Sequence, residues 1–141
     1  MFSKTNLIST LVTALWGFLG GYLLWGLIGD PFMKDHLGTA TGTIKETPDF
    51  GTLAFGCLIS GFAFSTLYSK WARGSHSSSQ GAQFGIWIAI FLGIGNGLIE
   101  YATANLLDLT GTITNALIYI VFFIVMGVLA SLVYNKMSTK N

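Results

Sequence analysis

A single ionisable side chain, Glu100, interrupts an otherwise uncharged apolar stretch that extends from about residue 82 to residue 107. Charged groups are costly inside a membrane-spanning segment, so such a residue is by default a candidate functional site. In a helix, at about 100° per residue, the face that carries Glu100 also carries Gly93, Asn96 and Gly97. Because small residues mark the sides on which membrane helices meet, we expect the Glu100 carboxyl to point into a helix bundle. No Lys or Arg lies at this depth, and a desolvated carboxyl without a cation tends to keep its proton.

Polar side chains from other apolar stretches would surround Glu100 in the same half of the membrane; they are Tyr22, Asn115 and Tyr119. Together with Asn96 they leave two alternatives. In the first, the group binds a proton, a cation or a polar ligand that enters from outside. In the second, it is structural: either a buried hydrogen-bond clamp or a carboxyl that reaches the outer interface. Proton pathways usually string several ionisable groups together, and the sequence offers only this one at depth.

Other residues with metal-binding or nucleophilic chemistry are few. An acidic group between the first two apolar stretches either collects a divalent cation or forms a solvated loop; it comprises Asp30, Asp35, His36, Glu46 and Asp49. Cys57 is the only cysteine, so it makes no internal disulfide and belongs to no paired-cysteine metal site. No hydrolase or metalloprotease signature is present. We therefore expect a non-enzymatic protein with no cofactor and no metal ion. A lipid-modifying enzyme is a further alternative, which would need a cluster of polar residues at one depth, and only the surroundings of Glu100 approach that.

The composition indicates that lipid, rather than water, surrounds most of the chain. Apolar residues make up 52% of it, charged residues only 9%, and the mean hydropathy is +0.64. Soluble domains carry roughly 25% charged residues, so this chain could not cover a globule's surface in water. The net charge of +1 gives no reason to expect a nucleic-acid partner.

Four stretches are long and apolar enough to cross a membrane as helices, which needs about 20 residues each. They are residues 7–29, 51–69, 82–107 and 113–134. The alternating pattern of a membrane barrel is absent. We therefore predict an all-α fold, a four-helix transmembrane bundle with antiparallel neighbours, that occupies residues 1–141 as a single four-span membrane domain.

Basic residues predict the orientation of the bundle, because they are enriched in cytoplasmic loops. One side receives Lys4, Lys70, Arg73, Lys136 and Lys140, whereas the other receives Lys34 and Lys45. Both termini are thus expected to be cytoplasmic. Amphipathic aromatic rings prefer the membrane interfaces, and this predicts anchors at the cytoplasmic side (Trp71, Tyr134) and the outer side (Trp25, Tyr101, Tyr119).

The connections between the spans differ in length. Between the first two spans lie about 21 residues, in which Pro31 is expected to begin a short separate helix that ends before Gly38. The polar turn at residues 74–80 is short enough to make the second and third spans adjacent.

Small residues at four-residue spacing predict where the helices pack, because they let neighbouring backbones approach. The third span carries Gly81, Gly85, Ala89, Gly93 and Gly97, the first carries Gly17 and Gly21, and the second carries Gly61. The long series on the third span either packs within the bundle or receives a second copy of the chain.

A weak repeat links the ends of the second and fourth spans. Ser65-x-x-Tyr68-x-Lys70 resembles the pattern that begins at Ser131 and continues through Tyr134. It is either a trace of a duplicated hairpin or two ordinary interface endings.

Three stretches resemble segments of known membrane proteins: Gly20–Gly26, Tyr68–Gly74 and Tyr101–Leu106. On these the chain resembles small four-span bacterial inner-membrane proteins of domain-of-unknown-function families. The resemblance implies a bacterial inner membrane and transfers no binding residue. We expect an accessory or interaction subunit, or a small homo-oligomer, in contact with the lipid bilayer or within a larger membrane complex. The alternative is a small transporter or channel with Glu100 as its protonatable or cation-binding site.

Overall fold

The structure, a computed structural model, describes residues 2–42, 45 and 47–138. Within this part of the chain, four continuous helical segments are long and apolar enough to cross a membrane: Lys4–His36, Phe50–Ala72, Ser78–Thr103 and Leu109–Ser138. The predicted all-α four-helix fold is confirmed, and no strand occurs among the described residues beyond one isolated bridge.

The first span is longer than predicted because the helix does not end before Pro31. It consists of α1 (Lys4–Gly21), the π-helix η1 (Tyr22–Gly29), α2 (Asp30–Met33) and the 3₁₀-helix η2 (Lys34–His36) without a break. A proline ring clashes with the carbonyl of the preceding helical turn, and the wider π-helical turn before Pro31 accommodates it. The expected separate short helix is therefore wrong, and the outer connection begins only at Leu37.

The third span also contains a π-helix. It consists of α4 (Ser78–Ala89), η3 (Ile90–Gly95) and α5 (Asn96–Thr103). It ends at Thr103 rather than at residue 107 because Ala104 is extended (φ −142°, ψ 153°) and the residues after it pair with the first outer connection.

The second and fourth spans are uninterrupted α-helices, α3 (Phe50–Ala72) and α6 (Leu109–Ser138). Asp49 caps α3 by accepting a bond from the Thr52 N–H. The helix ends where Arg73 adopts a left-handed conformation (φ 48°) and Gly74 follows with φ 87°.

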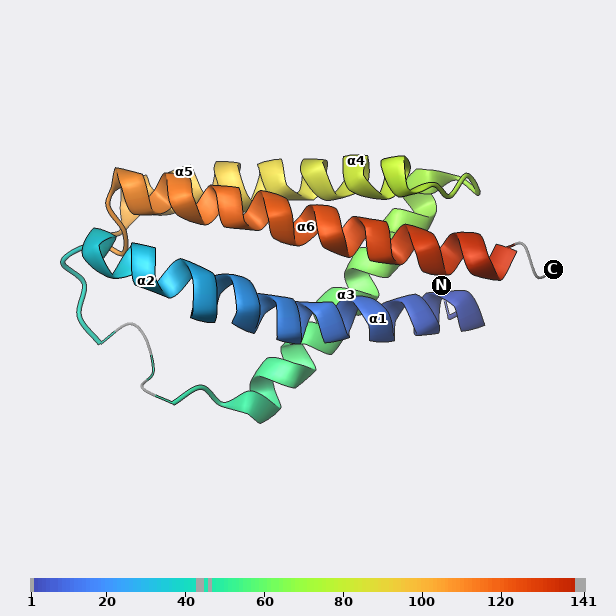
Figure 1. Ribbon diagram of the computed structural model, residues 1–141, viewed down its shortest axis with the longest axis horizontal. Helices are drawn as coiled ribbons and strands as arrows, with labels where there is room; N and C mark the ends of the chain where they lie inside the picture. The colour runs from blue at the N-terminus through green and yellow to red at the C-terminus, as the bar shows by residue number, and fades with distance from the viewer. Residues whose placement is uncertain (1, 43–44, 46, 139–141) are drawn as a thin grey trace.

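Three of the four spans lie side by side, and α3 crosses them obliquely (Figure 1). The first span packs on α3 and α6, and α4 packs closely on α6, whereas α3 has few contacts with α4 or α6. The second and third spans are thus neighbours only near their connecting turn. The start of α1 and the end of α6 lie at the same end of the bundle (Figure 1).

The glycine series on the third span faces α6. A Cβ at Gly81 or Gly85 would overlap the backbone of Gly127 or Phe123, and one at Gly93 would stand 2.6 Å from the Tyr119 Cβ. Gly61 is packed on α1 and Gly17 near Cys57, whereas nothing lies within 4 Å of a Cβ at Gly21. Small residues therefore hold each antiparallel pair together at close range.

The two helical hairpins repeat one another in atomic detail. A Cβ at Gly61 of α3 would lie 2.9 Å from both the Thr10 carbonyl oxygen and the Ala14 nitrogen of α1. A Cβ at Gly127 of α6 would meet the corresponding two atoms of α4, the Gly81 carbonyl oxygen and the Gly85 nitrogen. Position n of α3 thus corresponds to n + 66 in α6, and position n of α1 to n + 71 in α4.

The same equivalence explains the Ser-x-x-Tyr repeat. Ser65 and Ser131 each follow their packed glycine by four positions, and both are fully buried. The Ser65 hydroxyl lies 3.3 Å from the Tyr134 hydroxyl, and Tyr68 in turn lies close to the Ser131 side chain. This crosswise exchange favours the duplicated-hairpin interpretation over two independent interface endings.

Candidate functional site

Glu100 does not occupy the interior of the bundle. Its side chain is exposed, and with Gly97, Thr112 and Asn115 it lines a cavity of only about 10 Å³. A cavity needs roughly 10–15 Å³ to hold one water molecule. Asn96, one turn earlier on α5, is exposed as well.

The π-helix η3 explains why the helical-wheel prediction for Glu100 is wrong. The prediction assumed α-helical spacing from Gly93 onward, but Ile90–Gly95 is π-helical and holds more residues in each turn. The residues after it are rotated relative to the Gly81, Gly85 and Ala89 series. Gly93 is therefore buried, Gly97 is half-buried and Glu100 is exposed.

The other residues expected around Glu100 separate into two groups. Tyr22 is 63% exposed and turns away from the bundle. Asn115 and Tyr119 are partly buried and contact Trp25, whose indole N–H donates to the Asn115 Oδ1 at 2.7 Å and whose ring lies edge-on to the Tyr119 ring at 4.8 Å. Trp25 therefore packs between η1 and α6, and its expected role as an interface anchor stays a prediction.

A buried polar cluster at the opposite end of the bundle was not predicted from the sequence. The Asn6 side-chain amide is 2% exposed. It donates to the Ser65 hydroxyl at 3.3 Å, the Thr66 hydroxyl at 3.1 Å and the Tyr134 hydroxyl at 3.1 Å. The cluster joins α1, α3 and α6. Tyr134, expected as an interface anchor, is instead a buried member of this cluster.

The cluster has spare hydrogen-bonding capacity. Among the described residues, Asn6 Oδ1 and the hydroxyl of Ser9 are buried without a partner. Most buried polar groups in proteins form hydrogen bonds, so these two atoms are exceptions that could each accept or donate a further bond. Its arrangement is that of an interhelical clamp, and it contains no carboxylate.

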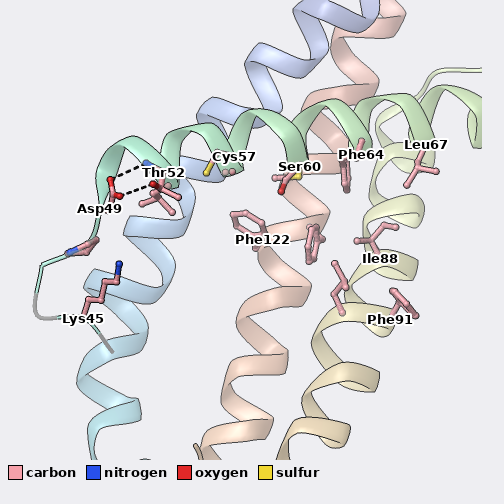
Figure 2. Close-up of a pocket in the computed structure, with 18 residues that line it drawn as sticks. Lys45, Asp49, Thr52, Cys57, Ser60, Phe64, Leu67, Ile88, Phe91 and Phe122 are labelled. Carbon is pink, nitrogen blue, oxygen red and sulfur yellow. Dashed lines mark hydrogen bonds between the residues drawn. The ribbon is translucent and has the colours of Figure 1, made fainter. Parts of the chain in front are cut away.

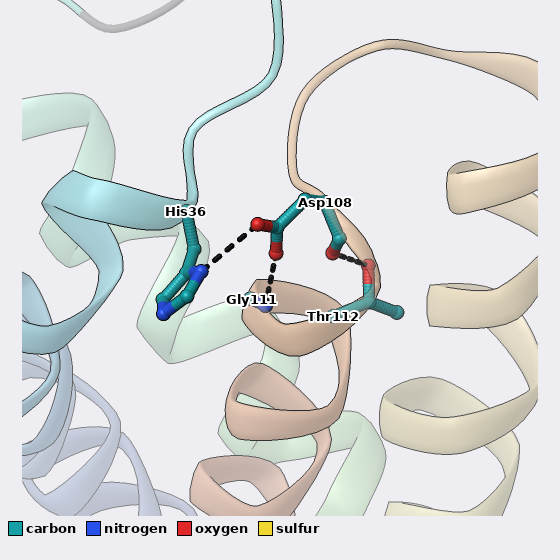
Figure 3. A network of polar contacts seen from close by, with 4 residues as sticks. All are labelled: His36, Asp108, Gly111 and Thr112. Atoms are coloured by element: carbon teal, nitrogen blue, oxygen red, sulfur yellow. Dashed lines mark hydrogen bonds and ion pairs between the residues drawn. The ribbon is translucent and has the colours of Figure 1, made fainter.

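A clasp joins the two hairpins at the end of the bundle opposite the start of α1 and the end of α6 (Figure 3). The His36 ring nitrogen Nδ1 lies 2.9 Å from the Asp108 carboxylate, which also accepts the Gly111 N–H at 2.7 Å. Backbone bonds join the same segments, from Gly38 N–H to the Leu106 carbonyl and from Asp108 N–H to the His36 carbonyl. The Gly111 N–H, and after it the His36 side chain, lower the pKa of Asp108.

The acidic outer residues show no arrangement suited to a metal ion. Within the described residues, no group of three or more His, Cys, Asp or Glu side chains is placed to hold one. His36 pairs with Asp108 instead, and Glu46 lies outside the described residues.

A groove of about 1010 Å³ lies between α3 and the α4–η3–α6 side of the bundle (Figure 2). One wall is α3, with Leu53, Gly56, Ser60 and Ala63 among its lining residues. The other wall is formed mainly by large apolar side chains: Ile88, Phe91, Leu92, Phe122, Phe123 and Met126. The groove lies between membrane-spanning helices, so it is a candidate binding site at membrane depth.

The hairpin repeat shows why the groove is wide at α3. The positions of α6 that hold Phe122, Phe123 and Met126 correspond to Gly56, Cys57 and Ser60 of α3. Large side chains on α6 thus face small ones on α3. A Cβ at Gly56 would have nothing within 4 Å, so no side chain occupies the space next to this position of the α3 wall.

The repeat also shows why α3 is not tied to α4. On the first span, the Trp16 indole N–H donates to the Phe122 carbonyl at 3.0 Å, and its ring lies over Gly20, where a Cβ would stand 2.6 Å from the ring. The equivalent tryptophan on α4 is Trp87, but Phe91 stands where Gly20 would be. Trp87 is 63% exposed, so the tie that closes α1 on α6 has no counterpart between α4 and α3.

Comparisons with known proteins do not identify the chain. It matches no protein-family model, no curated protein and no solved structure. Four apolar helices of spanning length make it an integral membrane protein in contact with lipid.

Proposed function

We propose that this protein is a non-enzymatic accessory protein of the membrane that holds one phospholipid in the groove between α3 and the α4–η3–α6 side. The observation that carries the proposal is the groove itself. Its volume of about 1010 Å³ is at the upper end of the usual range for ligand pockets, roughly 300–1,000 Å³.

The chemistry of the walls favours an amphipathic occupant. Along most of its length the groove offers aliphatic and aromatic side chains, which suit acyl chains. Its polar groups gather where α3 begins, at Lys45, Asp49 and Thr52, which suits a head group. An amphipath would therefore lie along α3 with its polar part at the outer end.

The proposed location is a bacterial inner membrane with both termini in the cytoplasm. The bias of Lys and Arg toward one side of the four spans supports this orientation. The start of α1 and the end of α6 share one end of the bundle, as the orientation requires.

Assembly with a second copy or a larger membrane complex is part of the same proposal. All residues of α3 from Phe50 to Ser60 are exposed except Cys57, which is half-buried. The first half of α3 is therefore not covered by the other helices of the chain. This supports a role as an interaction subunit, because membrane helices associate by packing against one another.

The transporter alternative rests on Glu100 and has weaker support. Its side chain is exposed beside a cavity too small for a water pathway. If it were right, Glu100→Gln would abolish a pH-dependent flux in proteoliposomes, and a flux unchanged by the substitution would remove Glu100 from any transport mechanism.

Thermal unfolding in detergent, with and without added phosphatidylethanolamine, tests the proposed function. A ligand that binds only the folded state raises the unfolding midpoint, so we expect a lipid-dependent rise for the unchanged protein. Gly56→Leu would add a bulky side chain to the α3 wall, where a Cβ has no neighbour within 4 Å, and should reduce this rise. Ala54→Leu adds the same side chain to an exposed position of α3 outside the groove and should keep it. Equal rises in both variants would contradict the proposal.

A further inference from the structure

The charged groups of the groove are confined to one place. Among its described lining residues, Lys45 and Asp49 alone carry a charge, and one is a cation and the other an anion. Figure 2 shows both at the end of the groove where α3 begins, with Leu67 toward the other end. The end of the groove where α3 begins, which we call its mouth, therefore carries one positive and one negative side chain. The rest of the described groove lining is uncharged.

The Asp49 carboxylate is fixed in position. Its two oxygens accept the Thr52 N–H at 3.1 Å and the Thr52 hydroxyl at 2.7 Å. The Thr52 hydroxyl, followed by the Thr52 N–H, lowers the pKa of Asp49, so the carboxylate stays ionised at neutral pH. An ionised carboxylate has about four acceptor sites, and two are left for a ligand.

Lys45 supplies the complementary charge. Its ammonium is a compact charge on a flexible stem that carries three donors, and Lys binds phosphate as a point charge. Because Lys45 and Asp49 lie at the same mouth, a purely anionic head group would gain one contact and meet a like charge at the other. A head group with both signs would satisfy the two residues together.

We propose that the occupant of the groove is a zwitterionic phospholipid with a primary amine, its phosphate beside Lys45 and its ammonium group beside Asp49. This inference rests on the proposed function, since it names the class of lipid held in the same groove. An ethanolamine ammonium offers three N–H donors to the carboxylate, as a lysine ammonium does. A choline group has no N–H and can offer its charge alone.

Competition between three lipids tests the inference directly. Delipidated protein in detergent receives equal amounts of phosphatidylethanolamine, phosphatidylcholine and phosphatidylglycerol, and native mass spectrometry reports which lipid remains bound. We expect phosphatidylethanolamine to be retained over each competitor by about two- to fivefold, the range of one exposed charge pair.

Charge variants show whether the mouth sets this preference. Lys45→Gln and Asp49→Asn should each remove most of it, and asparagine keeps the capping function at the start of α3. Lys34→Gln and Asp35→Asn remove the same charges from exposed positions on the same side of the membrane and should leave the preference unchanged.

The outcomes separate the head-group inference from the proposed function. Equal retention of the three lipids would contradict the inference that the bound lipid is zwitterionic. A preference for phosphatidylglycerol that only Lys45→Gln reduces would contradict it as well. If Gly56→Leu still reduces lipid retention in that case, the groove remains the lipid site. If Gly56→Leu retains lipid as fully as the unchanged protein, the proposed function fails together with the inference.

Discussion

Replacing Tyr134 by Phe tests the buried polar cluster that joins three of the four spans. The hydroxyl that this substitution removes accepts the Asn6 amide at 3.1 Å and donates to the Ser65 carbonyl at 3.3 Å. The aromatic ring stays, so its contacts with the rings of Tyr68 and His76, at 5.6 and 5.1 Å, are preserved. The substitution therefore removes hydrogen bonds and leaves packing nearly unchanged.

The expected magnitude follows from the number of bonds lost. An interhelical hydrogen bond in a membrane protein contributes about 0.6 kcal/mol on average and up to about 1.7 kcal/mol. Up to three such bonds are lost here, because the Tyr134 hydroxyl also lies 3.3 Å from the Ser65 hydroxyl. The Asn6 amide keeps Ser65 and Thr66 as acceptors. We expect Tyr134→Phe to lower the free energy of unfolding by about 1–3 kcal/mol.

Equilibrium unfolding in mixed micelles of increasing denaturing detergent measures this loss. Tyr22→Phe is the matched control, because Tyr22 is 63% exposed and makes no described side-chain hydrogen bond. If the two variants unfold at the same detergent fraction, the cluster contributes nothing and this account of the bundle is incorrect. A double substitution with Asn6→Ala should be less than additive, since the two residues share a bond.

Two further predictions concern the hairpin repeat and the outer clasp. Gly61→Ala and Gly127→Ala should both destabilise the bundle, by about 1–3 kcal/mol or more, because the added methyl meets equivalent backbone atoms of the partner helix in both hairpins. The loss should be larger for Gly127→Ala, whose methyl would overlap the Gly81 carbonyl oxygen, whereas the methyl at Gly61 would stand 2.9 Å from the Thr10 carbonyl oxygen. No loss for either variant in the same unfolding assay would count against the close packing of both hairpins. Asp108→Asn should loosen the connection at residues 37–49 at neutral pH, as measured by amide hydrogen exchange. Because the pKa of Asp108 is lowered from 3.8 in the folded protein, its contribution is present above that value and is lost as the pH falls through the folded pKa, so a difference that persists well below pH 3.8 would contradict the clasp.

The number of spans could be predicted from the sequence because it depends on how many apolar stretches are long enough to cross a membrane. Long stretches without charge have no alternative in lipid to a helix whose backbone groups are all paired. The ends of the spans were less predictable. Ala104 leaves the helix because its neighbours pair with residues 36–40, and a contact between distant segments leaves no local signal.

The candidate site could not be predicted for a similar reason. The expectation for Glu100 depended on α-helical spacing, and the π-helix Ile90–Gly95 changes that spacing without an obvious local cause. Asn6 lies just before the predicted first span, so its position in the sequence gives no sign that it is buried. The groove depends on which helices pair. It also depends on Phe91, which lies at the position of the third span that corresponds to Gly20, the residue that leaves room for the Trp16 ring.

The repeat at the ends of the second and fourth spans includes a glycine that takes part in helix packing. The Ser-x-x-Tyr-x-Lys pattern recurs with a glycine four positions before each serine, at Gly61 and Gly127. Including that glycine would have linked the repeat to helix packing, because small residues at this spacing mark close backbone contact.

Native mass spectrometry of the protein extracted gently from its own membrane tests the central claim most directly. We expect one retained phospholipid per chain in the unchanged protein and in Ala54→Leu, and clearly less in Gly56→Leu. A chain that carries no lipid, or lipid that Gly56→Leu retains as fully as the unchanged protein, would contradict the proposed lipid site.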